Sequence, residues 1–265
     1  MDAATVPALR NFFYFGQRDE SWLHLLALAS RAGYAVWWIS NHDNLAIDRE
    51  HAQFADQVQT INKTPVPSSQ SMDGGTLPLL KQAINDAAPR KLIVLHLFGA
   101  HPHYQLRHPP DRAPFRNIKD GVYQDMKAQG RSARVRGLRN DYDSALHYHD
   151  SVVAASLDLT HQTSGRSTWV YFSDHGQEVG SASDHAGHSV TSADGYRIPL
   201  LVWGAGVQSI PHHVFKQPVR TDWLGYSVLT LLGIAWPGHI AEHNVLDPRY
   251  QWTAPKLPAV VNFPP

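Results

Sequence analysis

The stretch from Thr168 to Glu178 constrains the fold of this chain more than any other part of the sequence. It starts with Thr-Trp-Val-Tyr-Phe, and such β-branched and aromatic residues are typical of a short buried strand. Asp174, His175 and Gly176 follow, so a carboxylate and an imidazole lie where this strand ends. Proteins of the α/β class place their sites at this edge of a parallel sheet, and both side chains are ligands of divalent metals. In the alternative interpretation, Asp174 caps a turn and His175 is incidental.

The composition excludes several classes of protein. The formal net charge is zero, so the composition does not show the excess of positive charge that is typical of nucleic-acid-binding proteins. There is no cysteine, and this excludes a disulfide scaffold, a thiolate metal site and a cysteine nucleophile. No apolar run reaches the roughly 18 residues of a membrane-spanning helix, and the first residues do not have the pattern of a signal peptide. The 17 histidines, several of them clustered after predicted strands, favour a zinc site.

Strands that alternate with helices predict a single α/β domain over residues 1–265, built on a parallel, right-handed doubly wound sheet. Strands are predicted at 34–39, 91–95, 168–172 and 197–203, with a further extended piece at 214–216. Helices are predicted at 21–32, 77–87, 140–160 and 220–232. We expect 45–72 to be a surface excursion that is partly helical near 48–58. We expect the basic segment 103–139 to be a solvated loop, which could also form a rim for an anionic acceptor.

Polar side chains also follow two other predicted strands. Asn41 comes after the first strand, and His96 and His101 flank a glycine turn after the second. His188 lies 14 residues beyond Asp174, in a loop that can fold back over the strand end. Because parallel strands end at one edge of a sheet, we expect these residues to lie close together. For each residue taken alone, an ordinary loop position or a structural histidine remains the alternative.

Thr5 marks the start of a helix, because it is followed by Pro7 in the first helical turn. Two roles are open for its hydroxyl. It can cap the helix, or it can be a nucleophile held at the positive end of the helix, where an attacked phosphate would also be stabilised.

In their order along the chain, these motifs resemble the catalytic domain of bacterial phosphoethanolamine transferases, in the alkaline phosphatase and sulfatase superfamily. The matching blocks are Ser173–Gly176, Val94–Pro102, Asn140–Asp143 with Tyr148 and Asp150, Gly187–His188 with Ile198–Trp203, Leu229–Gly233, and Thr5 with Val6–Leu9. The resemblance covers nearly the whole chain. It implies an alkaline phosphatase-like α/β/α sandwich with a mostly parallel central sheet.

The resemblance also implies an activity and roles for single residues. Thr5 would attack the phosphorus of phosphatidylethanolamine, carry the phosphoethanolamine group covalently, and pass it to lipid A or a lipopolysaccharide core saccharide. This would take place at the periplasmic face of the bacterial inner membrane. Asp174 and His175 would bind one tight zinc ion together with Thr5.

The remaining roles concern the substrate. By the same resemblance, His101 and His188 would bind the phosphate, a second zinc ion, or both. His96 would lie behind these residues, and Asn41 would contact the substrate phosphate.

The chain departs from the family at its start. The family carries an acidic zinc ligand on a strand upstream of the nucleophile, and transmembrane helices before that strand. We expect both to be absent here, with Asp2 or Asp43 as chemical substitutes for the acidic ligand. Two alternatives stay open: a phosphodiester hydrolase of the sulfatase fold, and a non-catalytic remnant. A sulfatase is disfavoured, because there is no cysteine and the segment after Thr5 lacks the arginine of the sulfatase motif.

Overall fold

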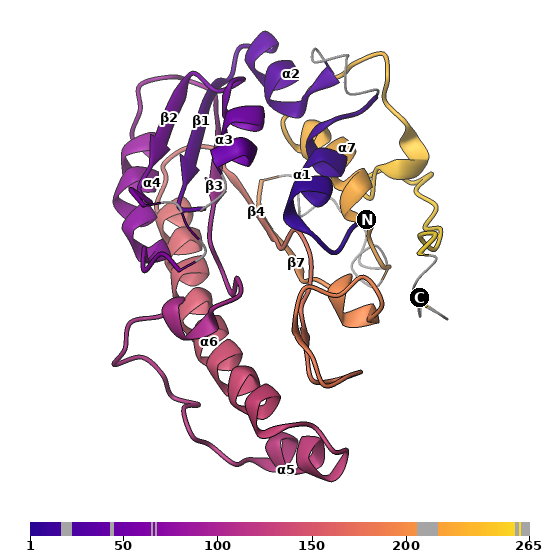
Figure 1. The fold of residues 1–265 in the computed structure, drawn as a ribbon. Helices are drawn as coiled ribbons and strands as arrows, with labels where there is room; N and C mark the ends of the chain where they lie inside the picture. The colour runs from indigo at the N-terminus through magenta and orange to yellow at the C-terminus, as the bar shows by residue number, and fades with distance from the viewer. Residues whose placement is uncertain are drawn as a thin grey trace.

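The strands of this protein form three separate hydrogen-bonded groups (Figure 1). The structure is a computed structural model, and it describes residues 1–16, 23–42, 45–64, 66, 68–205, 217–257 and 260. The first group is a parallel sheet in the order β2 (Gln57–Thr60), β1 (Ala35–Ser40), β3 (Lys91–His96). The other two groups are antiparallel pairs: β4 (Thr168–Phe172) with β7 (Leu200–Gly204), and β5 (Glu178–Val179) with β6 (Ala186–Gly187).

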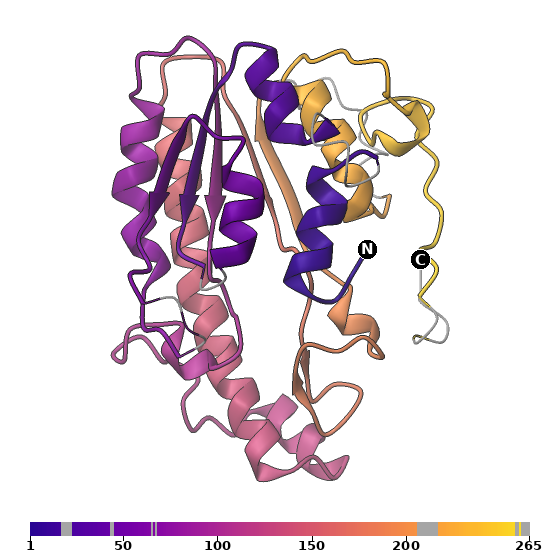
Figure 2. The ribbon, with the colours of Figure 1, turned by 45° about the horizontal axis from the view of Figure 1, so that its top comes forward.

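Helices cover both faces of the strands (Figures 1 and 2). One face carries α1 (Thr5–Phe13), α2 (Leu25–Arg31), α3 (Leu45–Ala52) and α7 (Thr221–Leu231). The opposite face carries α4 (Leu77–Ile84) and the long α6 (Ala133–His161), and α5 (Gly121–Ala128) packs against α6. This arrangement confirms the predicted α/β/α architecture.

The central strand β1 supplies the core on both sides. Its side chains alternate between faces, as the pleat of a strand requires. Val36 and Trp38 join the larger core beneath α1, α2 and α7, whereas Trp37 and Ile39 join a smaller core with Ala83 of α4. Burying an apolar side chain of this size stabilises a fold by about 2–3 kcal/mol. β1 is therefore the most firmly held strand, and its carboxyl end is a rigid support.

The expected direction of the strand after residue 197 is wrong. β7 begins at Leu200 and runs antiparallel to β4, with Val170 opposite Val202. The chain between the two strands contains the β5–β6 ribbon and no α-helix. A parallel return would need a long crossover, usually a helix, so the chain returns antiparallel. The strands are parallel in the β2–β1–β3 sheet and antiparallel in the β4–β7 pair.

β3 and β4 each keep one edge without a strand partner among the described residues. β3 pairs only with β1, and β4 pairs only with β7. All side chains of β3 and β4 are half-buried, whereas β1 is buried from Val36 to Ser40 between its two neighbours. The two parts of the sheet are thus not joined to each other by backbone hydrogen bonds within the described structure.

Two segments contain more regular structure than expected. The surface excursion 45–72 holds α3 and the parallel edge strand β2, whose Gln-Val-Gln-Thr sequence lacks a clear apolar alternation. The basic loop 103–139 holds α5 and the start of α6, at Ala133 rather than at Asn140. The Ser132 side chain caps α6 by accepting a hydrogen bond from Val135 N at 3.2 Å. Residues 21–22 and 214–216, predicted as helix and extended chain, lie outside the described residues.

A pair of buried histidines lies in the core near α2. His24 and His51 are 0 % and 1 % exposed, and their rings pack against Phe13 and Phe54. His24 Nδ1 accepts a hydrogen bond from Leu26 N, so its Nε2 donates to His51 Nδ1 at 3.0 Å. Burial, assisted by the neighbouring His51, lowers the pKa of His24 to about 3, and burial lowers that of His51 to about 4 although Glu50 opposes the shift. Among the described residues, no helix is both long and apolar enough to cross a membrane.

These shifts predict a loss of stability in mild acid. Both folded pKa values lie below the ordinary value of 6.5, so the stability is complete above pH 6.5 and falls as the pH drops toward 4. Each ring should cost about 2 kcal/mol of unfolding free energy at pH 5 relative to neutral pH. Urea unfolding at pH 7.5 and pH 5 measures the loss. The variant His51→Gln cannot titrate at this position but still accepts from His24, so it should lose about half of this contribution. An unchanged pH dependence in His51→Gln would contradict the assignment.

Candidate active site

Thr5 lies at the N-terminus of α1, with its hydroxyl against His175. The helix is capped by the backbone of Ala4 without a side-chain hydrogen bond, so Thr5 does not act as the cap. Instead, Thr5 Oγ1 lies 3.2 Å from His175 Nε2. His175 Nδ1 donates to the Gly176 carbonyl at 2.8 Å, which leaves the Nε2 lone pair directed at the threonine hydroxyl. The contact joins two residues 170 positions apart in the sequence.

Asp174 completes a group of three potential ligands. Its Oδ2 lies 3.5 Å from His175 Nε2, and its side chain is 25 % exposed. Zinc binds oxygen and nitrogen ligands at about 2.0–2.2 Å, which places tetrahedral ligand atoms roughly 3.3–3.5 Å from one another. The hydrogen bond from His175 Nδ1 to a backbone carbonyl is the support that metal-binding histidines usually have. The separations Thr5 Oγ1–His175 Nε2 and Asp174 Oδ2–His175 Nε2, 3.2 and 3.5 Å, are of the size expected for two ligands of one zinc ion.

Few side chains of the usual zinc-binding types are grouped with Asp174 and His175 in the described structure. Within the described residues, no three His, Cys, Asp or Glu side chains are arranged so that they could hold a metal ion. Asp2, one of the two expected substitutes for the acidic ligand, caps its own turn by accepting from Ala3 N at 2.9 Å. Asp43, the other one, lies outside the described residues. The Thr5 hydroxyl is the remaining candidate ligand beside His175.

Gly176 folds the following loop back over the strand end. A Cβ at Gly176 would lie only 1.9 Å from the carbonyl oxygen of Asp194, so only glycine fits there. Gly176 N also donates to Gly195 O at 2.9 Å. The returning loop carries His188, whose ring lies 4.4 Å from that of His175, centroid to centroid.

A row of imidazoles continues from His188 to β1. The His188 ring lies 5.9 Å from His101, and His101 lies 5.6 Å from His42. His42 follows β1, is 5 % exposed, and stacks on His96 with ring centroids 4.6 Å apart. Burial lowers the pKa of His42 to about 2, and neighbouring imidazoles and Arg107 add to this effect. The row is therefore neutral at its buried end.

His96 anchors the buried end of the row. Its Nδ1 lies 3.3 Å from Asp48 Oδ1, which also accepts from Trp38 Nε1 at 3.0 Å. Ser40 Oγ lies 3.4 Å from the same nitrogen. The rings of His42, His101 and His188 lie between His96 and His175, and the expected role of His96 behind the ligands stays a prediction.

Asn41 is occupied by structural contacts. Its Nδ2 donates to Asp73 Oδ1 at 2.8 Å, and its Oδ1 accepts from Ser71 Oγ at 2.5 Å. The residue is fully buried. Both polar atoms of the Asn41 amide are therefore already engaged in hydrogen bonds, which does not favour the predicted contact with substrate. The neighbouring His42 is part of the imidazole row.

The sequence-based prediction missed His42 and Asp73. His42 follows a predicted strand directly after Asn41, so the rule that selected Asn41 could equally have selected His42. Asp73 gave no such indication, because its neighbours predict only a turn before a helix. Its importance depends on contacts with residues far away in the sequence.

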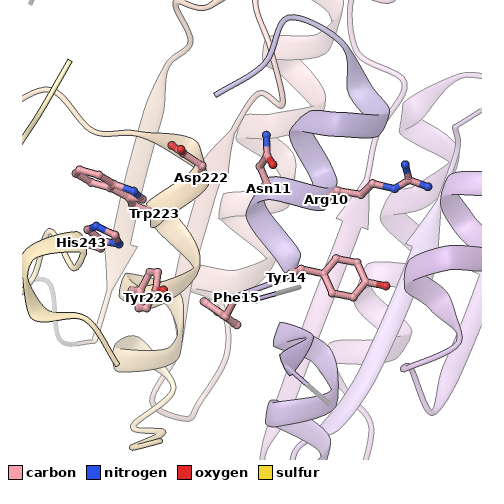
Figure 3. A pocket seen from close by; sticks show the side chains of 9 residues that line it. Arg10, Asn11, Tyr14, Phe15, Asp222, Trp223, Tyr226 and His243 are labelled. Carbon is pink, nitrogen blue, oxygen red and sulfur yellow. The ribbon is translucent and has the colours of Figure 1, made fainter. Parts of the chain in front are cut away.

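The cavity in Figure 3 lies at the opposite end of α1. It measures about 260 Å³, and its lining residues include Arg10, Asn11, Asp222, Trp223 and His243. None of the predicted site residues lines it. The candidate site is therefore the strand-end group around Thr5, not this cavity.

The fold and the site together define a class of protein: an α/β/α domain with a threonine hydroxyl beside an Asp-His pair at the strand ends. The sulfatase family model matches residues 6–234, directly after Thr5. The chain belongs to the sulfatase family.

Similar proteins give more detail. The chain is 28% identical to phosphoethanolamine transferase EptC of Escherichia coli (strain K12) over 242 residues, which cover 86% of this chain and 41% of EptC. It is 27% identical to phosphoethanolamine transferase CptA of Salmonella typhimurium over 267 residues, or 94% of this chain and 45% of CptA. The chain thus spans less than half of these relatives.

The fold agrees with solved structures. The C-terminal periplasmic domain of E. coli EptC, crystallised as a complex with Zn, superposes with a TM-score of 0.84 at 25% identity, over 95% of this chain and 74% of that chain. The soluble domain of lipooligosaccharide phosphoethanolamine transferase A from Neisseria meningitidis has the same fold, with a TM-score of 0.68 at 20% identity over 92% of this chain and 79% of that chain. The predicted resemblance and fold class are confirmed.

The geometry predicts zinc binding that depends on the Asp-His pair. Metal-free protein titrated with Zn²⁺ in a calorimeter should bind it, and Asp174→Ala or His175→Ala should weaken the affinity by about 100-fold or more, since each removes a direct ligand. The control is His147→Ala, which removes an exposed histidine from α6. Equal losses in the control and in the site variants would mean that zinc binds to scattered surface histidines.

Proposed function

We propose that this chain is the catalytic domain of a zinc-dependent phosphoethanolamine transferase with Thr5 as nucleophile. The observation that carries the proposal is the Thr5 hydroxyl, held 3.2 Å from His175 Nε2 and beside Asp174 at the start of a helix. A threonine hydroxyl is a weak nucleophile at neutral pH and needs activation of this kind. A hydroxyl that only capped a helix would not contact a distant histidine.

The surrounding residues suit a phosphoryl group. The positive end of the α1 dipole lies at Thr5, where a negatively charged phosphate is stabilised. Zinc held by Thr5, Asp174 and His175 would lower the pKa of the hydroxyl and offset phosphate charge. His188 lies next to this group and His101 lies next to His188, and both can donate hydrogen bonds to the phosphate oxygens, which stabilises charge during transfer.

The names of the relatives support the proposed donor. Proteins named phosphoethanolamine transferase are similar to this chain in sequence and fold, so phosphatidylethanolamine is the proposed donor. Lipid A or a lipopolysaccharide core saccharide is the proposed acceptor. Location at the periplasmic face of the inner membrane is proposed because a related structure is a periplasmic domain. A covalent intermediate on Thr5 divides the transfer into two displacements, and ping-pong kinetics should result.

The test is the intact mass of the zinc-loaded protein after incubation with phosphatidylethanolamine. We expect a phosphoethanolamine adduct on the wild-type chain, and no adduct on Thr5→Ala, which keeps the helix but lacks the hydroxyl. Thr5→Ser is the matched control, since it keeps a hydroxyl and should keep measurable labelling. Circular dichroism checks that the variants are folded.

The outcomes separate the alternatives. An adduct that remains in Thr5→Ala would show that the nucleophile is a different residue. Release of ethanolamine phosphate to water, without transfer to added lipopolysaccharide, would identify a phosphodiester hydrolase. Normal zinc binding without any adduct would contradict the proposed transfer from this donor.

A further inference from the structure

The candidate site is assembled from two parts of the sheet that share no backbone hydrogen bonds in the described structure. His42 follows β1, and His101 follows β3, whose last residue is His96. Asp174 and His175 follow β4. Transfer chemistry is sensitive to distance, and a displacement of about 1 Å can reduce the rate 100-fold. Some other contact must fix the separation of the two parts.

Asp73 holds together the first part of the site, which lies at the ends of β1 and β3. Its Oδ1 accepts hydrogen bonds from Asn41 Nδ2 and from Phe98 N, both at 2.8 Å, and its Oδ2 accepts from Gly99 N at 2.8 Å. Asn41 lies at the end of β1, and Gly99 lies two residues before His101 on the loop after β3. One buried carboxylate, 4 % exposed, therefore holds the ends of two strands together.

His149 on α6 connects this carboxylate to β4. Its Nδ1 lies 3.6 Å from Asp73 Oδ2, slightly beyond hydrogen-bond distance, and has no hydrogen-bond partner among the described residues. Its Nε2 lies 3.1 Å from the Tyr171 hydroxyl, and Tyr171 is three residues before Asp174. The adjacent Tyr148 accepts a hydrogen bond from Gly74 N at 3.1 Å, which fixes this part of α6 next to Asp73.

The protonation states are set by the surroundings. The facing His149 ring and the hydrogen bonds from Asn41 and Phe98 N keep the pKa of Asp73 below its ordinary value, although burial opposes this, so Asp73 is a carboxylate. Burial raises the pKa of Tyr171 to about 12, so Tyr171 keeps its proton. The consistent arrangement has Nδ1–H of His149 facing Asp73 and the Tyr171 hydroxyl donating to Nε2.

We propose that Asp73, His149 and Tyr171 form a buried polar bridge that positions the two parts of the site relative to each other. None of the three touches the reacting atoms in this proposal, which rests on the proposed function of Thr5. They act through Asn41 and the His101 loop on one side, and through β4 and its Asp-His pair on the other.

Tyr171→Phe is the most selective test, because it removes one hydroxyl and keeps the ring, which stacks on Trp169. The matched control is Tyr34→Phe. Tyr34 is also half-buried and donates to a backbone oxygen, Leu232 O, at 2.5 Å, but it lies away from the site. We expect the rate of Thr5 labelling to fall about tenfold in Tyr171→Phe and to stay unchanged in Tyr34→Phe. Equal labelling rates in the two variants would overturn the proposal.

A double-mutant cycle distinguishes positioning from general destabilisation. If Asp73 and Tyr171 act through one bridge, the rate losses of Asp73→Asn and Tyr171→Phe should be strongly non-additive. Asp73→Asn combined with Tyr34→Phe should be additive. Additive losses in both pairs would contradict a shared bridge, provided that circular dichroism shows folded protein in each case.

A second readout does not need turnover. In NMR spectra of histidine-labelled protein, Tyr171→Phe should shift the ring signals of His101, although the two residues lie on different parts of the site. Tyr34→Phe should leave them unchanged. His101 signals that do not move in Tyr171→Phe would overturn the bridge. This result can be read even if the protein forms no adduct, so failure of the bridge and failure of the proposed function are distinguishable.

Discussion

The contact between Thr5 and His175 is the interaction on which the candidate site depends. It brings the first residue of α1 against the residue that follows β4 and its Asp174, although 170 positions separate them. The approach is possible because α1 packs its buried side, including Phe12, against Phe172 at the end of β4. Burial of this aromatic pair therefore sets the distance at which the hydroxyl meets the imidazole. The packing of α1 against β4 in the core therefore also determines the geometry of the site.

The imidazole row shows how burial makes such a site possible. Protonated histidines at these separations would repel one another, and buried charge without a partner is costly. The buried end of the row avoids this cost by staying neutral: the pKa of His42 is about 2. His96 is held by Asp48 at the far end, and the exposed His188 forms the end nearest to Thr5. A neutral His42 within the row adds no positive charge that would repel a bound cation.

The sequence predicts the local parts of this molecule well. Trp169 and Val170 identify β4, and the strand-end rule places Asp174, His175 and His101 at one edge, because both depend on nearby residues. β7 is antiparallel because no crossover helix lies between β4 and β7, and the residue pattern of a strand does not carry this information. The start of α6 was also missed, because its first turns are rich in arginine and have little apolar periodicity. Asp73 could not be identified, since its partners come from three separate segments.

A buried polar bridge between two parts of a core can stabilise the fold less than apolar packing would. Asp73 and His149 are buried and Tyr171 is half-buried, and apolar residues of similar volume can often fill such a position without a loss of stability. Apolar packing tolerates small sliding movements, because it has no preferred direction. Hydrogen bonds at 2.8 Å from the Phe98 and Gly99 amides fix both distance and angle. A site whose ligands follow separate strands needs this directionality more than it needs the extra stability, and that requirement explains a charged group in the core.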